Sequence, residues 1–434
     1  MANIVITWHN QLLFINKFAR APFYQAFIDG LSAAGNNLLV FENMKFMKNE
    51  RGRIPQDYLI QIKEFKPDLF IFFNNQFWDI GADFTDIPII IYDVDSPNVF
   101  NNVDLLKNNK RYSYITMQTG NRQLLCNVLG CDMSQTIYIP PFTAIQKNEC
   151  DQDINISFCG SPWLFNDFND FNDFALSNPT NRDRKNAIKV LQEFKNNPQK
   201  SPEELYRDLN LLSDKSYLTF KNRQIVAARL AGSRRCKILS EIYDLGLEIR
   251  GVYWDGPMVK AFPELQLVYN PDPVYNITTT QALYNRSKIG FNTKHLQAKT
   301  GFSWRVCDIL ASNACLVTEK SSDIKKLGFK VPQYESIAEA RELCIKILKN
   351  ENMRKDIVTH SQEIIEKNHR VEQIIPFMED FIGLKLVSDT KGFINIIQNI
   401  DKKDDFPCID KKKLKFKQRL YYKLSKYFYK KIQL

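Results

Sequence analysis

Alternating strand and helix patterns in the first 142 residues limit the fold more than any other feature. Short apolar runs suited to buried parallel strands recur at residues 4–8, 38–41, 69–73, 87–94, 115–117 and 136–139. Helical patterns lie between them at residues 19–34, 56–65 and 120–129. Gly35 and Gly130 follow two of these helices, as glycines commonly do at helix ends. This order predicts a parallel sheet with helices on both faces.

A second series of the same kind follows a polar stretch at residues 146–153. Its expected strands are residues 154–159, 247–252, 265–269, 289–292 and 315–318. Its expected helices are residues 183–196, 202–212, 223–245, 279–286, 304–311 and 337–348, with two more at 353–367 and 371–382. The sequence therefore predicts two Rossmann-like α/β domains that face a cleft, residues 1–145 and 146–368. Terminal helices over residues 369–410 are expected to pack back toward the first domain, ahead of a tail at 411–434.

Composition excludes several classes of protein. The nine cysteines are odd in number and scattered, which indicates reduced thiols in a cytoplasmic protein. The chain begins with a strand-like run rather than a signal peptide, and no apolar run is long enough to span a membrane. The formal charge of +10 is matched by ten basic residues within the tail, so the body of the chain is neutral. This distribution is not typical of a nucleic-acid-binding protein.

Two common nucleotide-binding motifs are absent. The first strand leads into His9 and reaches no glycine before Gly30, so no dinucleotide-binding Gly-x-Gly-x-x-Gly follows it. No P-loop sequence occurs either. With only four histidines and no cysteine pair at zinc-ligand spacing, we expect no metal site and no cofactor.

The segment from Thr300 to Asp308 carries the most informative chemistry. A turn at Gly301 enters a helix whose first turn holds Arg305, and Asp308 lies one turn further on. Backbone N–H groups at a helix start bind phosphate, and an arginine adds a charge-assisted bond to a diphosphate. Asp308 is placed to accept hydrogen bonds from ribose hydroxyls. The alternative is an ordinary amphipathic helix with a solvated arginine–aspartate pair.

Residues 233–369 resemble the donor domain of bacterial GT-B glycosyltransferases, and most closely the CgeB-like (spore-maturation) group. The matching segments are residues 233–239, 247–254, 283–292, 301–308 and 311–318, in this order. The resemblance implies an enzyme that takes a sugar from a nucleotide-sugar, most simply a UDP-sugar. It also implies GT-B architecture, with the active site in the cleft between the domains.

The resemblance implies a role for each matching position. Asp308 corresponds to the acidic residue that binds the ribose, and Arg305 with Arg234 or Arg235 would neutralise the diphosphate without a metal. Tyr253 and Trp254 would flank the base or sugar, unless they form a packed aromatic pair. The other residues expected around the donor are Gly160, Ser161, Asn292, Thr300, Gly301, Phe302 and Ser303. Many retaining relatives carry an acidic residue where this chain has Thr300, so a retaining mechanism of that type is in doubt.

The catalytic base is expected from the first domain. Asp95 follows a strong strand, and Pro97 fixes a turn that presents it to the cleft. His9 follows the first strand and has a pKa type suited to a base near neutral pH. A turn-capping aspartate and a structural histidine are the alternatives. We favour Asp95, and with it an inverting reaction.

The basic tail is expected to bind another surface. Its basic face suits an anionic membrane and consists of Lys412, Lys415, Arg419, Lys423, Lys426 and Lys430. A solvated or domain-packing helix is the alternative. The expected acceptor is a surface glycan, on a lipid carrier or outer core, handled at the inner face of the cell membrane.

Two rival functions stay open. One is transfer to a protein such as flagellin, with the Phe-Asn-Asp repeat at residues 165–174 as a docking element. The other is a non-catalytic nucleotide- or sugar-binding module with a degenerate site. Thr300, which stands where many retaining relatives have an acidic residue, favours this alternative.

Overall fold

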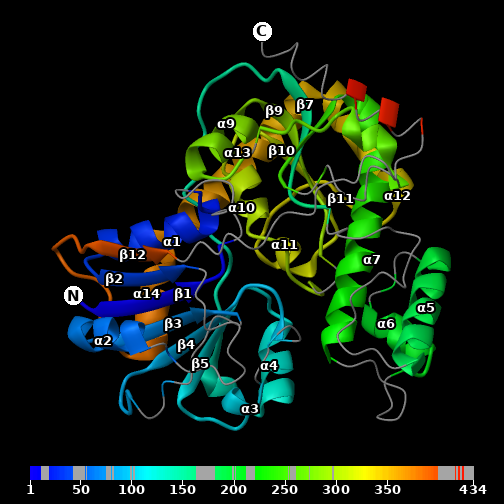
Figure 1. The fold of residues 1–434 in the computed structure, drawn as a ribbon. Coiled ribbons are helices and arrows are strands. Elements are labelled where there is room, and N and C mark those ends of the chain that lie inside the picture. The colour runs from blue at the N-terminus through cyan, green and yellow to red at the C-terminus, as the bar shows by residue number, and fades with distance from the viewer. Residues whose placement is uncertain are drawn as a thin grey trace.

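The computed structural model consists of two α/β domains, each built on a parallel sheet (Figure 1). It describes residues 1–10, 19–42, 54, 56–74, 80, 83–97, 100, 103–162, 181–197, 200, 202–211, 220–252, 254, 261–272, 274–295, 298–398, 416, 419–420 and 423–424. The expected fold class is confirmed.

The first sheet has seven strands in the order β12-β2-β1-β3-β4-β5-β6. They are β1 Asn3–Trp8, β2 Asn37–Glu42, β3 Leu69–Phe73, β4 Ile89–Asp93, β5 Tyr112–Thr116, β6 Thr136–Tyr138 and β12 Ile394–Gln398. One face packs on α1 (Pro22–Ala33) and α14 (Val371–Ile382). The other packs on α2 (Gln56–Phe65) and α4 (Asn121–Leu129), beside the short helices α3 (Val103–Leu106) and η4 (Met133–Gln135). Because both faces are covered, four of these strands are almost wholly apolar and buried.

The second sheet has five strands in the order β11-β10-β9-β7-β8. They are β7 Ile154–Cys159, β8 Leu247–Arg250, β9 Ser287–Asn292, β10 Cys315–Glu319 and β11 Gln333–Tyr334. On one face lie α7 (Phe220–Glu241) and α12 (Ile337–Lys349). On the other lie α9 (Ile277–Asn285), α10 (Arg305–Leu310) and α13 (Glu351–Asn368). The strand order reverses between β7 and β9, which makes their carboxyl ends the expected ligand crevice.

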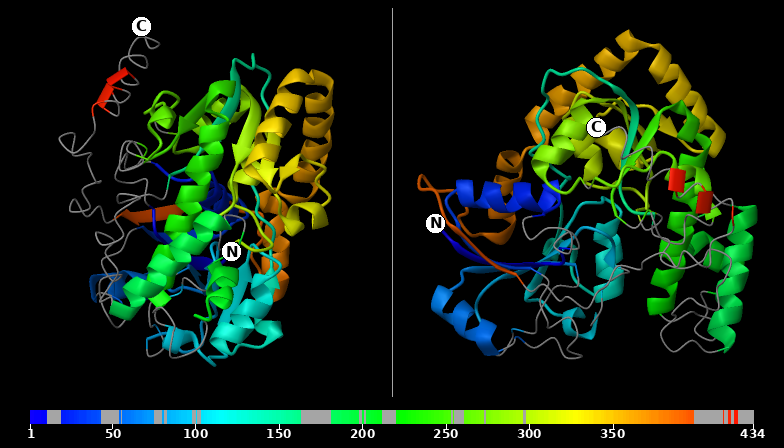
Figure 2. Two further views of the ribbon diagram at one scale, coloured as in Figure 1. Left: turned by 90° about the vertical axis from the view of Figure 1, so that its right-hand side faces the viewer. Right: turned by 45° about the horizontal axis from the view of Figure 1, so that its top comes forward.

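A small helical lobe interrupts the second domain between β7 and β8. It consists of α5 (Asn181–Asn196), α6 (Pro202–Asp208) and the first part of α7. The lobe has its own apolar core, which includes Phe194, Leu205 and Leu230. Figure 2 shows it lying away from the second sheet, while the last part of α7 packs on that sheet.

Two expected elements are wrong. Residues 265–269 do not form a strand: Pro263 begins a 3-10 helix, η6 (Pro263–Gln266), and only Tyr269 makes an isolated bridge to Ile249. The C-terminal segment is not helical throughout. After α14, β12 extends the first sheet alongside β2, because its chain returns to the N-terminal domain. Short helices not expected separately are η5 (Tyr243–Leu245) and α11 (Ser322–Lys326).

The tail and the Phe-Asn-Asp repeat fall largely outside the description. Of the basic tail residues, only Arg419 and Lys423 are described, and both are exposed. Lys412, Lys415, Lys426, Lys430 and residues 165–174 lie outside the described residues. No helix within the described ranges is long and apolar enough to cross a membrane.

Candidate functional site

Six of the residues expected around the donor meet at the crevice between β7 and β9. We call Gly160, Ser161, Arg235, Asn292, Ser303 and Arg305 the basic cluster. Gly160 and Ser161 follow β7, Asn292 ends β9, and Arg305 begins α10. Arg235 comes from α7 and reaches the same end of the sheet, where it contacts Thr293 and Ser161. Parallel strands bring these positions together because their carboxyl ends share one edge.

Arg235 is held rigidly within this cluster. Its Nε donates to Thr293 Oγ1 at 2.8 Å, and its Nη1 donates to the carbonyl oxygen of Ser161. Burial, together with the nearby charge of Arg305, lowers the pKa of Arg235 to about 9. An anionic ligand would stabilise the charged form of this buried guanidinium.

Arg305 approaches the same point from the start of α10. Its Nη1 donates to Asn292 Oδ1 at 3.4 Å, and Ser303 Oγ donates to the same oxygen at 3.3 Å. A Cβ at Gly160 would lie 3.1 Å from Arg305 Nη2, so the absence of a side chain at Gly160 leaves room for the Arg305 guanidinium. Among the described residues, neither Arg235 nor Arg305 forms an ion pair with a carboxylate.

Of the aromatic residues expected around the donor, the two that the structure describes, Trp254 and Phe302, are buried. Trp254 is fully buried in the core, and its Nε1 donates to the carbonyl oxygen of Gly160 at 2.5 Å. It therefore supports the Gly160 turn from below and has no face open to a base, which corrects the expectation. Phe302 is likewise buried, in the core beneath α10. Tyr253 lies outside the described residues.

Asp308 is buried at the junction of the two domains. Its Oδ1 accepts a hydrogen bond of 2.6 Å from Thr143 Oγ1, and only 2% of the residue is exposed. Burial raises the pKa of Asp308 to about 7, although the Thr143 bond and the charges of Arg305 and Arg370 oppose the rise. Thr143 lies in the chain that joins the domains, so Asp308 ties α10 to this connecting segment.

The Thr300 turn also contacts the first domain. Thr300 Oγ1 accepts a hydrogen bond of 2.9 Å from the backbone N–H of Gly120. Gly301 lies against the side chain of Gln118, which a Cβ would overlap at 2.3 Å. Arg234, in contrast, does not take part in the basic cluster and pairs with Glu319 at 2.6 Å.

Asp95 lies across from this turn, just beyond the end of β4. Its Oδ2 accepts a hydrogen bond of 2.7 Å from Asn74 Nδ2, and Gln118 Nε2 donates to its carbonyl oxygen at 2.6 Å. Gln118 therefore joins Asp95 to the Gly301 turn. The residue is exposed to solvent, but the surrounding protein still disfavours its charge and raises its pKa to about 6, against the effect of Asn74.

The other candidate base is His9, which is exposed after the end of β1. Asp93, which the sequence analysis did not single out, lies buried beside Asp95. Its Oδ2 accepts hydrogen bonds from Thr116 Oγ1 at 2.9 Å and from Asn121 Nδ2 at 2.8 Å. Burial raises the pKa of Asp93 to about 7.

Trp304 was also missed, although it directly precedes Arg305. Its ring stacks on Phe23 of α1, with centroids 5.5 Å apart, and lies 5.8 Å from Tyr24. A large aromatic residue at the start of the predicted helix was the available signal. Through this stack, the segment that holds Arg305 is fixed to the first domain.

Within the described residues, no group of three or more histidine, cysteine, aspartate or glutamate side chains is arranged to hold a metal ion. The expectation of no metal stays a prediction.

Comparison with known proteins gives one family match. Residues 234–380 match the model of a family described as glycosyl transferase-like. The predicted class of enzyme, a glycosyltransferase, is confirmed. The matched segment of this chain contains Arg234, Arg235, Arg305 and Asp308. The narrower resemblance to the CgeB-like group stays a prediction, and no curated protein sequence matches the chain.

Three solved structures are distantly similar to this chain. HepE of Anabaena, in complex with UDP-glucose, is 10% identical, with a TM-score of 0.49 over 88% of this chain and 100% of that one. The BGT protein of T4 phage, in complex with UDP-glucose, is 11% identical, with a TM-score of 0.46 and the same coverage. A glycosyltransferase of Rickettsia africae ESF-5 is 10% identical, with a TM-score of 0.46 over 88% of this chain and 97% of that one.

Proposed function

We propose that the protein transfers a sugar from a UDP-sugar to a glycan acceptor, with the donor diphosphate in the basic cluster. The observation that carries this proposal is the convergence of Arg235 and Arg305 on one glycine turn at the strand-order reversal. Two fixed guanidinium groups match the charge of a diphosphate, and Gly160 lets the phosphate approach the backbone.

The two arginines would stabilise the leaving group. When the bond between the anomeric carbon and the diphosphate oxygen breaks, negative charge develops on that oxygen. Fixed cations aimed at this charge lower the barrier, and they supply what a divalent metal supplies in other enzymes. The proposed reaction is therefore independent of a metal.

Asp95 would act as the base. In a single displacement, the acceptor hydroxyl attacks the anomeric carbon, its proton passes to the Asp95 carboxylate, and UDP departs. Asp95 is suited to this role because it lies opposite the Gly301 turn, linked to it by Gln118. One base on the face opposite the leaving group gives an inverting reaction, and Thr300 offers no carboxylate for the alternative.

Asp308 would bind the ribose hydroxyls of the donor. In the structure its Oδ1 accepts from Thr143, so donor binding would use Oδ2 or replace that bond. The contact would place the nucleotide next to the segment that joins the domains.

The acceptor is proposed to be a surface glycan presented at the inner face of the membrane, which the basic tail would bind. Co-sedimentation with anionic vesicles tests the location: a protein lacking residues 411–434 should lose binding, and unchanged binding would dismiss the membrane role. A protein acceptor and a non-catalytic binding module are the rival proposals.

A panel of UDP-, GDP- and dTDP-sugars, assayed for release of the nucleotide diphosphate, tests the proposed function. Release from a UDP-sugar at a rate above the spontaneous one supports it, and NMR of the product anomer tests inversion. UDP should also raise the melting temperature more than GDP does. If no nucleotide changes the melting temperature and no sugar is released, the donor site is absent.

A further inference from the structure

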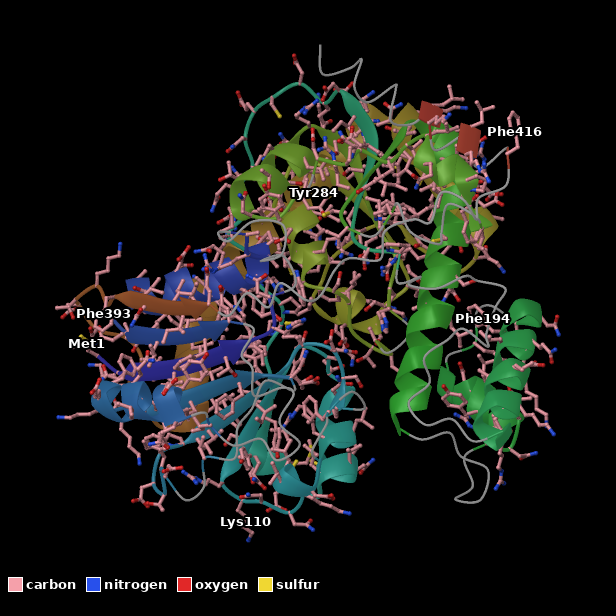
Figure 3. The ribbon with its side chains drawn as sticks, viewed as in Figure 1. Met1, Lys110, Phe194, Tyr284, Phe393 and Phe416 are labelled. Carbon is pink, nitrogen blue, oxygen red and sulfur yellow. The ribbon has the colours of Figure 1, made fainter. Side chains whose placement is uncertain are left out.

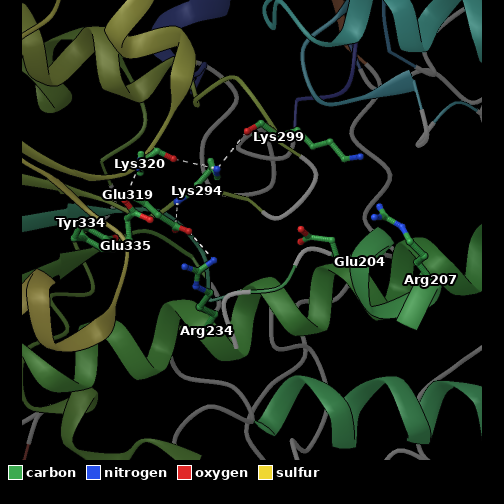
Figure 4. Close-up of a pocket in the computed structure, with 10 residues that line it drawn as sticks. Glu204, Arg207, Arg234, Lys294, Lys299, Glu319, Lys320, Tyr334 and Glu335 are labelled. Carbon is green, nitrogen blue, oxygen red and sulfur yellow. Dashed lines mark hydrogen bonds and ion pairs between the residues drawn. The ribbon is translucent and has the colours of Figure 1, made fainter. Parts of the chain in front are cut away.

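A second site lies beside the basic cluster, next to Arg234 of α7. It is a cavity of about 390 Å³, which we call the side cavity (Figure 4). Its walls are the strand ends of β10 and β11, the loop after β9, α7 and helix α6 of the lobe. A volume of this size is in the range of small-molecule pockets and accommodates a sugar ring with a substituent.

Charged side chains dominate the walls. The cationic ones among the described residues are Arg207, Arg234, Lys294, Lys299 and Lys320. The carboxylates are Glu204, Glu319 and Glu335. The described lining therefore has an excess of two positive charges, close to the charge of one phosphate group.

Two of the carboxylates are already engaged by cations of the lining. Arg234 pairs with Glu319 at 2.6 Å, and Lys320 pairs with Glu335 at 2.5 Å. The backbone N–H of Lys294 also donates to Glu319, at 3.1 Å. These carboxylates are thus positioned by protein groups, and they orient the cations rather than offer a site to a cation from solution.

Lys294 is partly buried where it lines the cavity. Its Nζ donates to the carbonyl oxygens of Lys320 at 3.1 Å and Lys299 at 3.5 Å. Burial lowers the pKa of Lys294, and the nearby Arg234 adds to this effect, while Glu319 opposes it. An anion in the cavity would stabilise this ammonium. Figure 4 shows Arg207 and Glu204, from the lobe, on the side opposite Lys294.

The cavity adjoins the proposed reaction site. Lys299 of its wall is followed directly by Thr300, which contacts Gly120 of the first domain. Gln118 then connects the turn to Asp95. A molecule in the cavity thus lies on the same edge of the second sheet as the donor, next to the domain junction.

We propose that the side cavity binds an acidic sugar of the acceptor, through its phosphate or carboxylate group. Lys294, Lys299 and Arg207 would contact the anion, and Arg234 would be held ready by Glu319. The assignment of this sugar to the acceptor rests on the proposed function. The binding of an anion in the side cavity does not. The lobe that interrupts the domain would then serve to complete the acceptor site.

Saturation-transfer NMR and calorimetry with the full chain, saturated with UDP, test this proposal. The probes are glucose 6-phosphate and glucuronate, with glucose as the uncharged comparison. We expect both acidic sugars to bind about tenfold or more tightly than glucose, as one or two charge-assisted contacts would give. The double variant Arg207→Glu with Lys299→Glu should lose this preference while it keeps its affinity for UDP.

The matched control reverses the same number of charges at the exposed residues Lys107 and Lys110 of the first domain, which do not line the cavity (Figure 3 labels Lys110). It should retain the preference for acidic sugars. Equal binding of glucose and the acidic sugars, or an unaltered preference in the cavity variant, would overturn the proposal even if UDP binds normally. Competition between glucose 6-phosphate and UDP would also overturn it, because the anion would then occupy the basic cluster.

A comparison of UDP-glucuronate with UDP-glucose distinguishes the donor from the acceptor as the source of the anion. If the cavity variant weakens only UDP-glucuronate, the acidic sugar belongs to the donor and the acceptor proposal is wrong. Loss of UDP binding in the wild-type protein contradicts the proposed function, and this outcome is separate from the preference for acidic sugars.

Discussion

The guanidinium groups of Arg235 and Arg305 lie over the ring of Phe158, at 5.6 and 5.8 Å from its centroid. The ring attracts both cations, but it does not neutralise them. Burial and the charge of Arg305 lower the pKa of Arg235, so holding the two charges together is unfavourable in free energy. A diphosphate between them would remove that cost, which makes this arrangement the centre of the proposed donor site.

Gly160→Ala should weaken UDP binding about tenfold, because the new methyl group would lie 3.1 Å from Arg305 Nη2 and 3.3 Å from the Phe158 ring. Calorimetry with UDP measures the effect. The melting temperature of the variant should fall only slightly, since the flexible end of Arg305 can move aside and the buried Phe158 ring must shift by only a few tenths of an ångström. Unchanged UDP affinity would place the phosphate away from this turn.

Asp308→Ala should weaken UDP binding, whereas Thr143→Val should not. Thr143→Val removes the donor to a buried carboxylate, so we expect it to lower the free energy of unfolding by about 1–3 kcal/mol. Denaturant unfolding and UDP titration of both variants separate the two roles. If Asp308→Ala lowers stability but leaves UDP affinity intact, Asp308 only stabilises the domain junction and does not bind the donor.

Stability should fall as pH rises from about 5 to 7. Burial raises the pKa of Asp93 and of Asp308 to about 7, far above the value of an aspartate in an unfolded chain. In this window the folded protein binds more protons than the unfolded chain, so each carboxyl lowers the free energy of unfolding by up to about 1.4 kcal/mol per pH unit. Asp93→Asn and Asp308→Asn should each flatten the profile, and a slope equal to that of the wild type would contradict the assigned burial.

Asp95→Asn should abolish transfer and leave UDP affinity within about twofold of the wild type. In the wild type, kcat should rise with pH through about 6, because the base must be deprotonated. His9→Gln should retain both the activity and this pH dependence. If the dependence disappears in His9→Gln and persists in Asp95→Asn, the histidine is the base.

The sequence predicts the parts of the fold that depend on periodicity and on strand ends. The apolar runs locate both parallel sheets, and the carboxyl ends of β7 and β9 bring together Gly160, Asn292 and Arg305 as expected. A glycine turn before a helix, with an arginine in the first helical turn, can be recognised from the sequence alone, because these residues are neighbours along the chain.

The rest depends on contacts between distant segments. Asp308 is buried because Thr143 approaches from the chain between the domains, and no local pattern encodes that approach. β12 is short and half-polar, so its pairing with β2 follows from the return of α14 to the first domain. Trp254 resembles a ligand-stacking residue in sequence, and only the path of β8 places it beneath the Gly160 turn.

Calorimetric titration with UDP, UMP and uridine tests the central claim most directly. The wild type should bind UDP about tenfold or more tightly than UMP, because the second phosphate reaches the paired arginines. Arg305→Ala should lose this preference, while Arg341→Ala, which alters an exposed arginine–aspartate pair, should retain it. Equal affinities for UDP and UMP in the wild type, or an intact preference in Arg305→Ala, would contradict a diphosphate site between Arg235 and Arg305.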